Sequence, residues 1–512
     1  MNTNINSRSL KLKKTLLQLL PDDTILHNRG CGINYCQRRQ KIPFDAVPSD
    51  TWFLQERLCD KIAIDISWSQ LEPREGEYLW DQPEWEGCFK SWMDAGFKVL
   101  LKVRGMDTLG TFYNQGTPQW VFDAGAHYVD EDISSYRNTF LLNNIPENEQ
   151  KPIRYPVYWD DVYLEKVSGL LRAMGERYSG NPMVESVAIA HMGRWGEMHI
   201  ADHYHHDKWI REGFTVQTYN QTHRAIADLY RQAFPNTPLQ QSISAPCFDI
   251  TTLDDAAPVL EYLIRNRVMI KAGGLGKTWH PNALSPWLDR AEHDLFSKIR
   301  YRTKIVFENL VLPEALELIL DLGTSYWQRG GEANGLGELN IAKDIPIQEK
   351  KIYSFCKFFP EEYGRLTIED QKNIWRRMAL RTGYRIAAEA VDTELNGKNL
   401  VTTFFWVNRG AAPCFEEFEI CAALYGSGHR MLWSASQKPS CGCSPEIWDS
   451  RVHFADTLNW TLPSLPEGEY ELRFGIRHLG FAHEMMELAN AGRDAEGMYP
   501  AAKLSIGKNI QV

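Results

Sequence analysis

Apolar residues along the chain fall into short β-prone runs that alternate with stretches of helical periodicity. The run KIAIDISW at 61–68 is followed by a helical pattern over 85–95, which ends before Gly96, and then by KVLLKV at 98–103. A strand, a loop, a helix and a second strand in this order form a βα repeat, which makes the strands parallel. Eight such strands are predicted, centred near residues 31, 63, 99, 186, 241, 269, 305 and 325. This alternation predicts an α/β fold, a (β/α)8 TIM barrel over residues 26–340.

The pattern changes near residue 385. The segments LVTTFFWVNRG, FEICAALYG and YELRFGIRH alternate or run β-rich, and turn residues such as Gly397 and Gly426 separate the strands. These features predict an all-β sandwich domain over 385–512. Residues 341–384 are expected to form a helical connector, and residues 1–25 a variable amphipathic lead-in.

Composition and charge narrow the classes of partner. The 512 residues carry a net charge of −10, which argues against a nucleic-acid partner. No segment reaches the roughly 18 consecutive apolar residues of a membrane span, so no membrane association is expected. The start of the chain shows no signal-peptide pattern, so the ten Cys are expected to be reduced thiols in a cytoplasmic protein.

The stretch MVESVAIAHMGRWGEMH at 183–199 combines a strand with a polar, aromatic exit. Its first half is apolar, and its second half brings Arg194, Trp195 and Glu197 together. In a barrel of this class, active sites lie at the carboxyl ends of the strands. Glu197 is therefore a candidate catalytic residue, although an ion pair with Arg194 in a loop explains it equally well.

A second carboxylate, Glu308, follows the predicted seventh strand, TKIVF. Retaining glycosidases need two carboxyl groups about 5 to 5.5 Å apart, one as acid/base and one as nucleophile. Strand ends four and seven face one another across the top of a closed barrel, which suits this chemistry. Beside Trp195, a desolvated Glu197 would suit the role of general acid.

Two motifs carry a resemblance to a known group of enzymes. The fragment ISWSQLEPREGEYLWD at 66–81 and the spaced Trp, Phe and Gly residues that follow it to residue 101 resemble the clan-A glycoside hydrolases and their beta-galactosidase-like barrels. The segment LANAGRDAEGMYPAAKLSI near the C-terminus resembles an uncharacterised sandwich domain that follows such barrels in bacterial proteins.

The resemblance implies a retaining mechanism with Glu197 as acid/base and Glu308 as nucleophile. It also exposes a departure: these enzymes usually have Asn before the acid/base, where it binds the sugar 2-hydroxyl, and this chain has Gly196. Either another residue makes that contact, or the activity has drifted or been lost.

Further residues are candidates for substrate binding. Arg104 either holds a carboxylate bidentately or forms an ordinary ion pair at the barrel top, and Trp327 is either a sugar platform or a core residue. The other candidates are Trp195, His199, Trp279 and His280. The long loops 106–156 and 199–215 are expected at the same barrel end as Glu197, with Trp120 and Tyr128 among the wall residues.

Several histidines crowd the exit of the fourth strand: His191, His199, His203, His205 and His206. With Asp202 and Asp207 nearby they could hold a metal, but His199 and His203 stand in a loop-like stretch without a helical zinc motif. They are therefore interpreted as substrate-loop residues, and neither a metal nor another cofactor is expected. Cys441 and Cys443 are too close in sequence for a usual metal knuckle.

Three hypotheses follow, in order of preference: a retaining glycoside hydrolase acting on a carbohydrate, a catalytically silent carbohydrate-binding barrel, and a metal-dependent hydrolase using the histidines near 199–206. Metal analysis separates the third from the others, and a panel of aryl glycosides separates the first two. The sandwich either braces the barrel or mediates assembly into a homo-oligomer, and composition does not decide between these roles.

Overall fold

The computed structural model describes residues 10–11, 14–36, 43–46, 52–106, 115–131, 153–200, 206–247, 250–272, 283–285, 288–308, 313–329, 339–340, 343–344 and 367–506. The chain divides into two compact units. The barrel unit comprises Gly32–Ala379, and the sandwich unit comprises Met1–Cys31 together with Leu380–Val512. Within the described residues, no helix is both long and apolar enough to cross a membrane.

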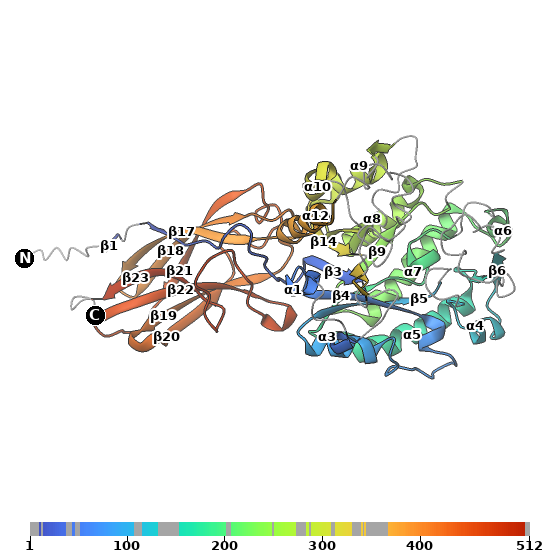
Figure 1. The fold of residues 1–512 in the computed structure, drawn as a ribbon, viewed down its shortest axis with the longest axis horizontal. Coiled ribbons are helices and arrows are strands. Elements are labelled where there is room, and N and C mark those ends of the chain that lie inside the picture. The colour runs from blue at the N-terminus through green and yellow to red at the C-terminus, as the bar shows by residue number, and fades with distance from the viewer. Residues whose placement is uncertain are drawn as a thin grey trace, which may run out of the picture. The chain divides into compact units, whose positions relative to one another are not determined.

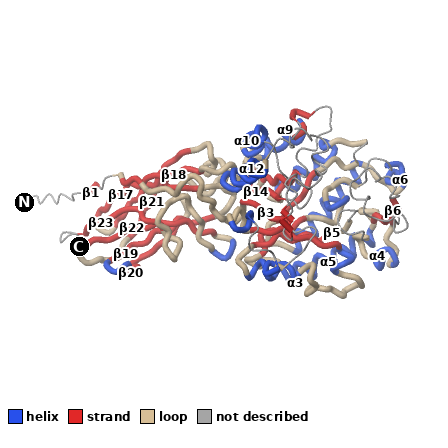
Figure 2. The backbone as a smooth tube through the Cα atoms, in the orientation of Figure 1, coloured by secondary structure: helices blue, strands red, loops and turns tan. Residues whose placement is uncertain are grey.

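Eight parallel strands close the barrel in chain order, which confirms the predicted (β/α)8 architecture (Figures 1 and 2). The strands are β3 (Gly32–Cys36), β4 (Lys61–Ser67), β5 (Lys98–Arg104), β8 (Val184–Ala188), β9 (Leu239–Ile243), β10 (Met269–Ala272), β13 (Ile305–Glu308) and β14 (Thr324–Arg329). Most described strand residues are buried, as expected for strands whose two faces are both covered.

Helices surround the strands (Figure 2). The longer ones are α3 (Glu86–Asp94), α5 (Asp161–Tyr178), α7 (Val216–Ala233), α8 (Ala257–Arg265), α9 (Arg290–Ile299), α10 (Pro313–Leu320) and α12 (Ile368–Arg381). Their starts follow local capping chemistry: the side chain of Asp160 accepts a hydrogen bond from the Tyr163 N–H, and Thr215 does the same for Thr218. The helical pattern predicted over 85–95 agrees with α3 to within one residue at each end.

The barrel unit also contains several short helices and strands. They are α1 (Trp52–Gln55), α2 (Trp68–Leu71), α4 (Gln119–Asp123), α6 (His206–Arg211), the antiparallel pair β6 (Tyr128–Glu131) and β7 (Ile153–Pro156), β11 (Ala283–Ser285), β12 (Leu288–Asp289), β15 (Leu339–Asn340) and β16 (Lys343–Asp344). Single 3-10 turns occur at Phe44–Ala46, Arg194–Gly196 and Leu253–Ala256.

Two antiparallel sheets form the sandwich unit, as predicted. One sheet has the order β1-β17-β18-β21 and the other β20-β19-β22-β23. The strands are β17 (Ile386–Asn396), β18 (Asn399–Asn408), β19 (Phe418–Gly426), β20 (Arg430–Gln437), β21 (His453–Thr461), β22 (Gly468–His478) and β23 (Tyr499–Ile506), with 3-10 turns at Ser427–His429 and Phe481–His483.

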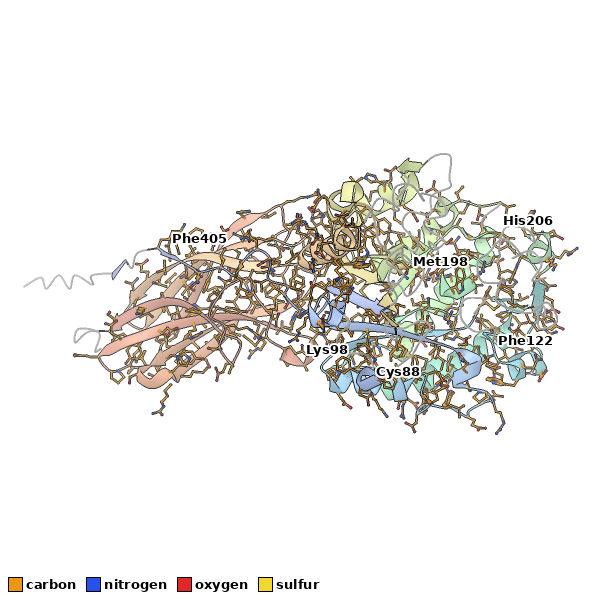
Figure 3. The ribbon with its side chains drawn as sticks, in the orientation of Figure 1. Cys88, Lys98, Phe122, Met198, His206 and Phe405 are labelled. Carbon is orange, nitrogen blue, oxygen red and sulfur yellow. The ribbon has the colours of Figure 1, made fainter. Side chains whose placement is uncertain are left out.

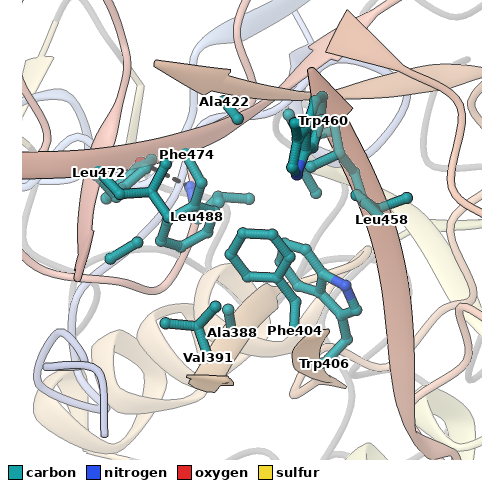
Figure 4. Packing of buried hydrophobic residues seen from close by; sticks show 14 of the residues in the cluster. Ala388, Val391, Phe404, Trp406, Ala422, Leu458, Trp460, Leu472, Phe474 and Leu488 are labelled. Atoms are coloured by element: carbon teal, nitrogen blue, oxygen red, sulfur yellow. Dashed lines mark hydrogen bonds between the residues drawn. The ribbon is translucent and has the colours of Figure 1, made fainter. Parts of the chain in front are cut away.

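Alternate residues of these strands point into one apolar core between the sheets. Phe404 of β18 packs on Phe474 of β22 with ring centroids 5.1 Å apart, and Trp406 and Trp448 extend the same cluster. Figure 4 shows Phe404, Trp406 and Phe474 with aliphatic side chains around them. The core thus joins the two sheets.

The start of the chain belongs to the sandwich, which corrects the expected boundaries. The short strands β1 (Leu10–Lys11) and β2 (Thr15–Leu16) both pair with β17, so residues expected to be a variable lead-in instead extend a sheet. The carbonyl of Arg29 accepts a hydrogen bond from the Tyr384 hydroxyl, 2.8 Å away. The barrel begins only at Gly32, because residues 14–31 find their backbone partners in the sandwich.

Candidate active site

Glu308 is the last residue of β13, the seventh barrel strand, and only 6% of it is exposed. Its Oε2 atom forms an ion pair with the ammonium group of Lys271, which is 2% exposed. Lys271 lies on the neighbouring strand β10, which is parallel to β13 and pairs Lys271 with Val306. The fold therefore brings a carboxylate and an ammonium group together, away from solvent, near the carboxyl ends of the strands.

Glu197 is half-buried on a tightly wound loop, residues 193–199, which we call the Glu197 loop. The expectation that Glu197 follows its strand directly is wrong, because β8 ends at Ala188 and several residues separate the two. The backbone is left-handed at Gly193, Trp195, Gly196 and Met198. Non-glycine residues seldom adopt this conformation, and such strain is common at functional sites.

The loop keeps this shape through a dense set of contacts. The N–H of Arg194 donates to the carbonyl of His199 at 2.9 Å, and the N–H of Ile200 donates to the carbonyl of Pro246 at 2.9 Å. The Met198 side chain, labelled in Figure 3, is completely buried. Such anchoring holds Glu197 on rigid backbone rather than on a free loop.

The structure gives a steric reason for Gly196 in place of the expected Asn. The φ angle of Gly196 is +69°, and a Cβ atom there would lie 2.6 Å from both Cα and Cβ of Ala190. A side chain of any kind would therefore collide with the main chain that leaves β8. Since Asn does not fit at this position, any contact with a sugar 2-hydroxyl has to come from another residue.

A small cavity links the two carboxylate-bearing segments. Gly196 of the Glu197 loop and Lys271, the partner of Glu308, both line it. It has room for about one or two water molecules. The remaining wall residues come from five barrel strands and from the residue that follows β8: Cys36, Ala63, Ile64, Asp65, Leu100, Lys102, Ala188, Ile189, Gln240 and Ser242.

The barrel interior is unusually polar around this cavity. Interiors of such barrels are dominated by bulky branched side chains, whereas here Asp65, Lys102, Gln240 and Lys271 are all buried. The Oε1 atom of Gln240 has no hydrogen-bond partner among the described residues. A polar interior with small apolar neighbours suits a site that binds or transforms a polar molecule.

Arg104 ends β5 and is buried beside Asp65, with 3.5 Å between Nη2 and Oδ1. Of the two roles considered for Arg104, this geometry matches the ion pair at the barrel top. Asp65 and Lys102 occupy paired positions on β4 and β5. Charged groups of both signs thus lie side by side in this part of the barrel.

Two of the expected substrate-binding side chains lie within the Glu197 loop. The guanidinium of Arg194 lies 4.1 Å from the centroid of the Trp195 ring, and the half-buried Trp195 ring meets His199 edge-on at 6.2 Å. His199 is buried, and its Nδ1 lies 3.3 Å from the carbonyl oxygen of Glu197. Trp195 and His199 therefore contact one another on the loop that carries Glu197.

Other expected residues are placed differently or fall outside the description. Trp327 is fully buried, with its ring 5.9 Å from that of Phe307, a packing that matches the core alternative. Trp279 and His280 lie outside the described residues, as do His203 and His205. Among the described residues, no group of three or more His, Cys, Asp or Glu side chains could hold a metal ion.

The described part of the first long loop lies where it was expected. The hydroxyl of Thr117 donates to the carbonyl of Gly105 at 2.6 Å, and the N–H of Ser69 donates to the carbonyl of Gly116 at 2.9 Å. These bonds attach the loop to the residues that follow β4 and β5. The loop therefore starts at the carboxyl ends of the strands, where the segment carrying Glu197 also leaves the barrel.

A series of buried side-chain hydrogen bonds supports the Glu197 loop from outside the barrel. The amide of Gln241 donates to the carbonyl of Gly196 at 3.3 Å, and its Oε1 lies 3.0 Å from Nε2 of His223 on α7. Because an amide oxygen can only accept, His223 must carry its proton on Nε2. Burial lowers the pKa of His223 to about 4 and that of His191 to about 3, so both are neutral at pH 7.

The motif at 66–81 proves to be a structural device. Glu72 is 2% exposed, and its carboxylate accepts hydrogen bonds from the indole of Trp68 at 2.7 Å and from the N–H of Gly76 at 2.8 Å. Burial raises the pKa of Glu72 although these bonds oppose the shift. The hydrogen bonds of Glu72 therefore stabilise the loop after β4.

Lys271, Asp65, Lys102 and Gln240 escaped the sequence analysis. A signal was present, since each is a polar residue within an apolar barrel strand, as in MIKA for β10. Alternation along a strand places them on the inner face, where a polar side chain needs a partner or a function.

No protein-family model matches the chain, and no curated protein matches it. Solved structures do match. Endo-glycoceramidase II from a Rhodococcus species has 12% identity and a TM-score of 0.36 over 87% of this chain and 100% of its own. The endo-beta-1,4-mannanase from Thermotoga petrophila has 10% identity and a TM-score of 0.40 over 93% and 98%. The beta-galactosidase from Rahnella sp. R3 has 13% identity and a TM-score of 0.40 over 73% and 59%.

The similarity to these proteins is one of fold. The assignment of this chain as a (β/α)8 barrel with a β-sandwich follows from its own strand order.

Proposed function

We propose that the chain is a retaining glycoside hydrolase that cleaves an O-glycosidic bond of a carbohydrate with Glu308 and Glu197. The observation that carries the proposal is the shared cavity. Gly196, which precedes Glu197, and Lys271, which binds Glu308, line the same small space inside the barrel. The neighbours of the two carboxylates thus meet at one cavity, which supports a double displacement by this pair.

The environments of the two carboxylates suit different roles. Glu308 is buried against an ammonium group, which favours the ionised form that a nucleophile needs. Glu197 is half-buried on a loop that also carries Trp195, and partial burial of a carboxyl group favours the protonated form that a general acid needs. The cavity itself is too small for a sugar ring, so the sugar is expected outside it.

In this mechanism Glu308 attacks the anomeric carbon while Glu197 gives its proton to the leaving oxygen. A covalent glycosyl-enzyme forms, and the bond to the leaving group breaks. Glu197, now a carboxylate, then removes a proton from water, which attacks the same carbon and releases Glu308. Configuration is retained because two inversions occur.

The test starts with a panel of aryl glycosides and continues with two substitutions. Glu308→Gln should abolish turnover by a factor of about 10⁴ or more, because both steps need the nucleophile. Glu197→Gln should still form the glycosyl-enzyme from a substrate with an activated leaving group, but should hydrolyse it slowly. Azide, which needs no general base, should restore turnover in the Glu197 variant and give a glycosyl azide of retained configuration.

Glu212→Gln serves as the matched control, since Glu212 is exposed in the same unit, and it should keep the wild-type rate. Wild-type rates in both Glu197 and Glu308 variants would overturn the assignment of the pair. If the unmodified protein binds sugars but cleaves none of them, the carbohydrate-binding barrel becomes the better explanation.

A further inference from the structure

The ion pair between Lys271 and Glu308 is difficult to explain by stability alone. Both side chains are more than nine-tenths buried, and both come from strands of the barrel wall. Removing two charges from water costs free energy that their mutual attraction often fails to offset. Apolar residues of similar size are therefore often as stable or more stable at such positions.

The position of the pair suggests why it is nevertheless present. Lys271 lines the cavity that Gly196 also lines, and its ammonium group binds one carboxylate oxygen of Glu308, Oε2. A buried carboxylate without a counter-ion would tend to take up a proton. The ammonium group opposes this tendency and fixes the orientation of the carboxylate.

We propose that Lys271 is a positioning residue for Glu308, which holds the carboxylate by its Oε2 atom and keeps it ionised. This inference rests on the proposed function, because it gives Glu308 the role of nucleophile. Lys271 itself forms no bond with the substrate in this scheme.

Other charged groups lie in the same part of the barrel and share its electrostatics. Asp65 pairs with Arg104, Lys102 occupies the strand position beside Asp65, and Glu197 stands on its loop. Deeper in the barrel, the hydroxyl of Tyr326 on β14 donates to Glu185 on β8 at 2.7 Å, across the barrel. The ammonium group of Lys271 contacts Glu308 directly.

The kinetic test compares Lys271→Met with Lys271→Arg across pH. The acid limb of kcat/KM reports ionisation of the nucleophile in the free enzyme. Loss of the ammonium group removes a charge that opposes the effect of burial, so in Lys271→Met this limb should move to higher pH by about one unit or more. Lys271→Arg keeps a positive charge and should move the limb back toward its wild-type position.

Lys61→Met is the matched control. Lys61 is also a fully buried lysine of the barrel wall and pairs with Asp60 at 2.7 Å, but it lies at the first residue of β4, the opposite end of the strands. Its loss should leave the acid limb unchanged. An equal shift in Lys61→Met and Lys271→Met would indicate a general structural effect and overturn the proposal.

Two measurements keep the proposal independent of turnover. Infrared difference spectra, with the Glu308→Gln spectrum subtracted, follow the ionisation of Glu308 directly, and its midpoint should rise in Lys271→Met.

The double variant Lys271→Met/Glu308→Met should unfold at or above the wild-type temperature, because it removes both charges. An unchanged Glu308 midpoint, or a double variant clearly less stable than wild type, would overturn the role of Lys271. Absence of hydrolysis with a shifted midpoint would overturn the proposed function alone.

Discussion

At the scale of single residues, the backbone at Gly196 decides which side chain can precede Glu197. Asn tolerates a left-handed backbone better than most residues. The main free-energy cost of placing Asn at position 196 is therefore the collision with Ala190. Gly196→Asn should therefore lower the free energy of unfolding by about 1–3 kcal/mol and should reduce any glycosidase activity instead of improving it. Urea unfolding followed by fluorescence measures the first effect, and aryl glycoside turnover the second.

Gly96→Asn separates the collision from the backbone conformation. Gly96 has a φ of +88°, and a Cβ atom there would meet nothing within 4 Å. It follows α3, where Asn is an accepted replacement for glycine, so the cost should stay below about 1 kcal/mol. An equal decrease in the free energy of unfolding in Gly96→Asn and Gly196→Asn would show that the collision with Ala190 does not cause the destabilisation.

At the scale of elements, one buried carboxylate joins two helices. Glu86 in the first turn of α3 is 2% exposed. It accepts hydrogen bonds from Arg177 and Tyr178 of α5 and forms an ion pair with Lys90. Burial opposes ionisation, but these partners outweigh it and lower the pKa of Glu86 to about 2. A depressed pKa means that the stabilisation is complete above the unfolded value near 4.5 and is lost as pH falls toward 2.

Glu86→Gln should therefore lower the free energy of unfolding at pH 7 by about 3 kcal/mol, and the difference from wild type should shrink below pH 4.5. Denaturant titrations at a series of pH values measure both. Glu261→Gln is the control: the pKa of Glu261 is also lowered to about 2, by Arg302 and Arg265, yet the Glu261 side chain is 40% exposed. Solvent screens such pairs, so little stability should be lost there.

The same scale shows how far the sequence could predict the structure. Barrel strands such as 61–67 and helices such as 161–178 were predictable because burial imposes a period on the chain. The exit of β8 was not, since the left-handed residues Trp195 and Met198 follow no local preference and depend on tertiary contacts. The Lys271–Glu308 pair was equally hidden, because it depends on which neighbouring strands lie side by side.

At the scale of the whole molecule, both ends of the chain contribute to one unit. Residues 14–31 supply strand β2 and several hydrogen bonds to the sandwich, including a mutual pair in which the Asn28 amide donates to the Glu487 carbonyl at 2.8 Å and the Glu487 N–H donates to Asn28 Oδ1 at 2.9 Å. Cys31 and Tyr384 lie in the same buried cluster. The sandwich is thus completed by a segment that the barrel separates from it in sequence.

This arrangement predicts that the sandwich can be rebuilt without the barrel. Residues 10–31 joined to residues 380–506 by a short Gly/Ser linker should fold cooperatively, because the linker replaces a long loop whose closure costs entropy. Residues 380–506 alone should unfold at lower denaturant concentration, since Ala390 and Val391 lose their partners on β2 and Glu487 loses Asn28. A third variant, the linked chain with Asn28→Ala, should fall between the two. Circular dichroism during urea titration gives the three midpoints, and equal midpoints for the linked and truncated chains would show that the N-terminal segment contributes no stability.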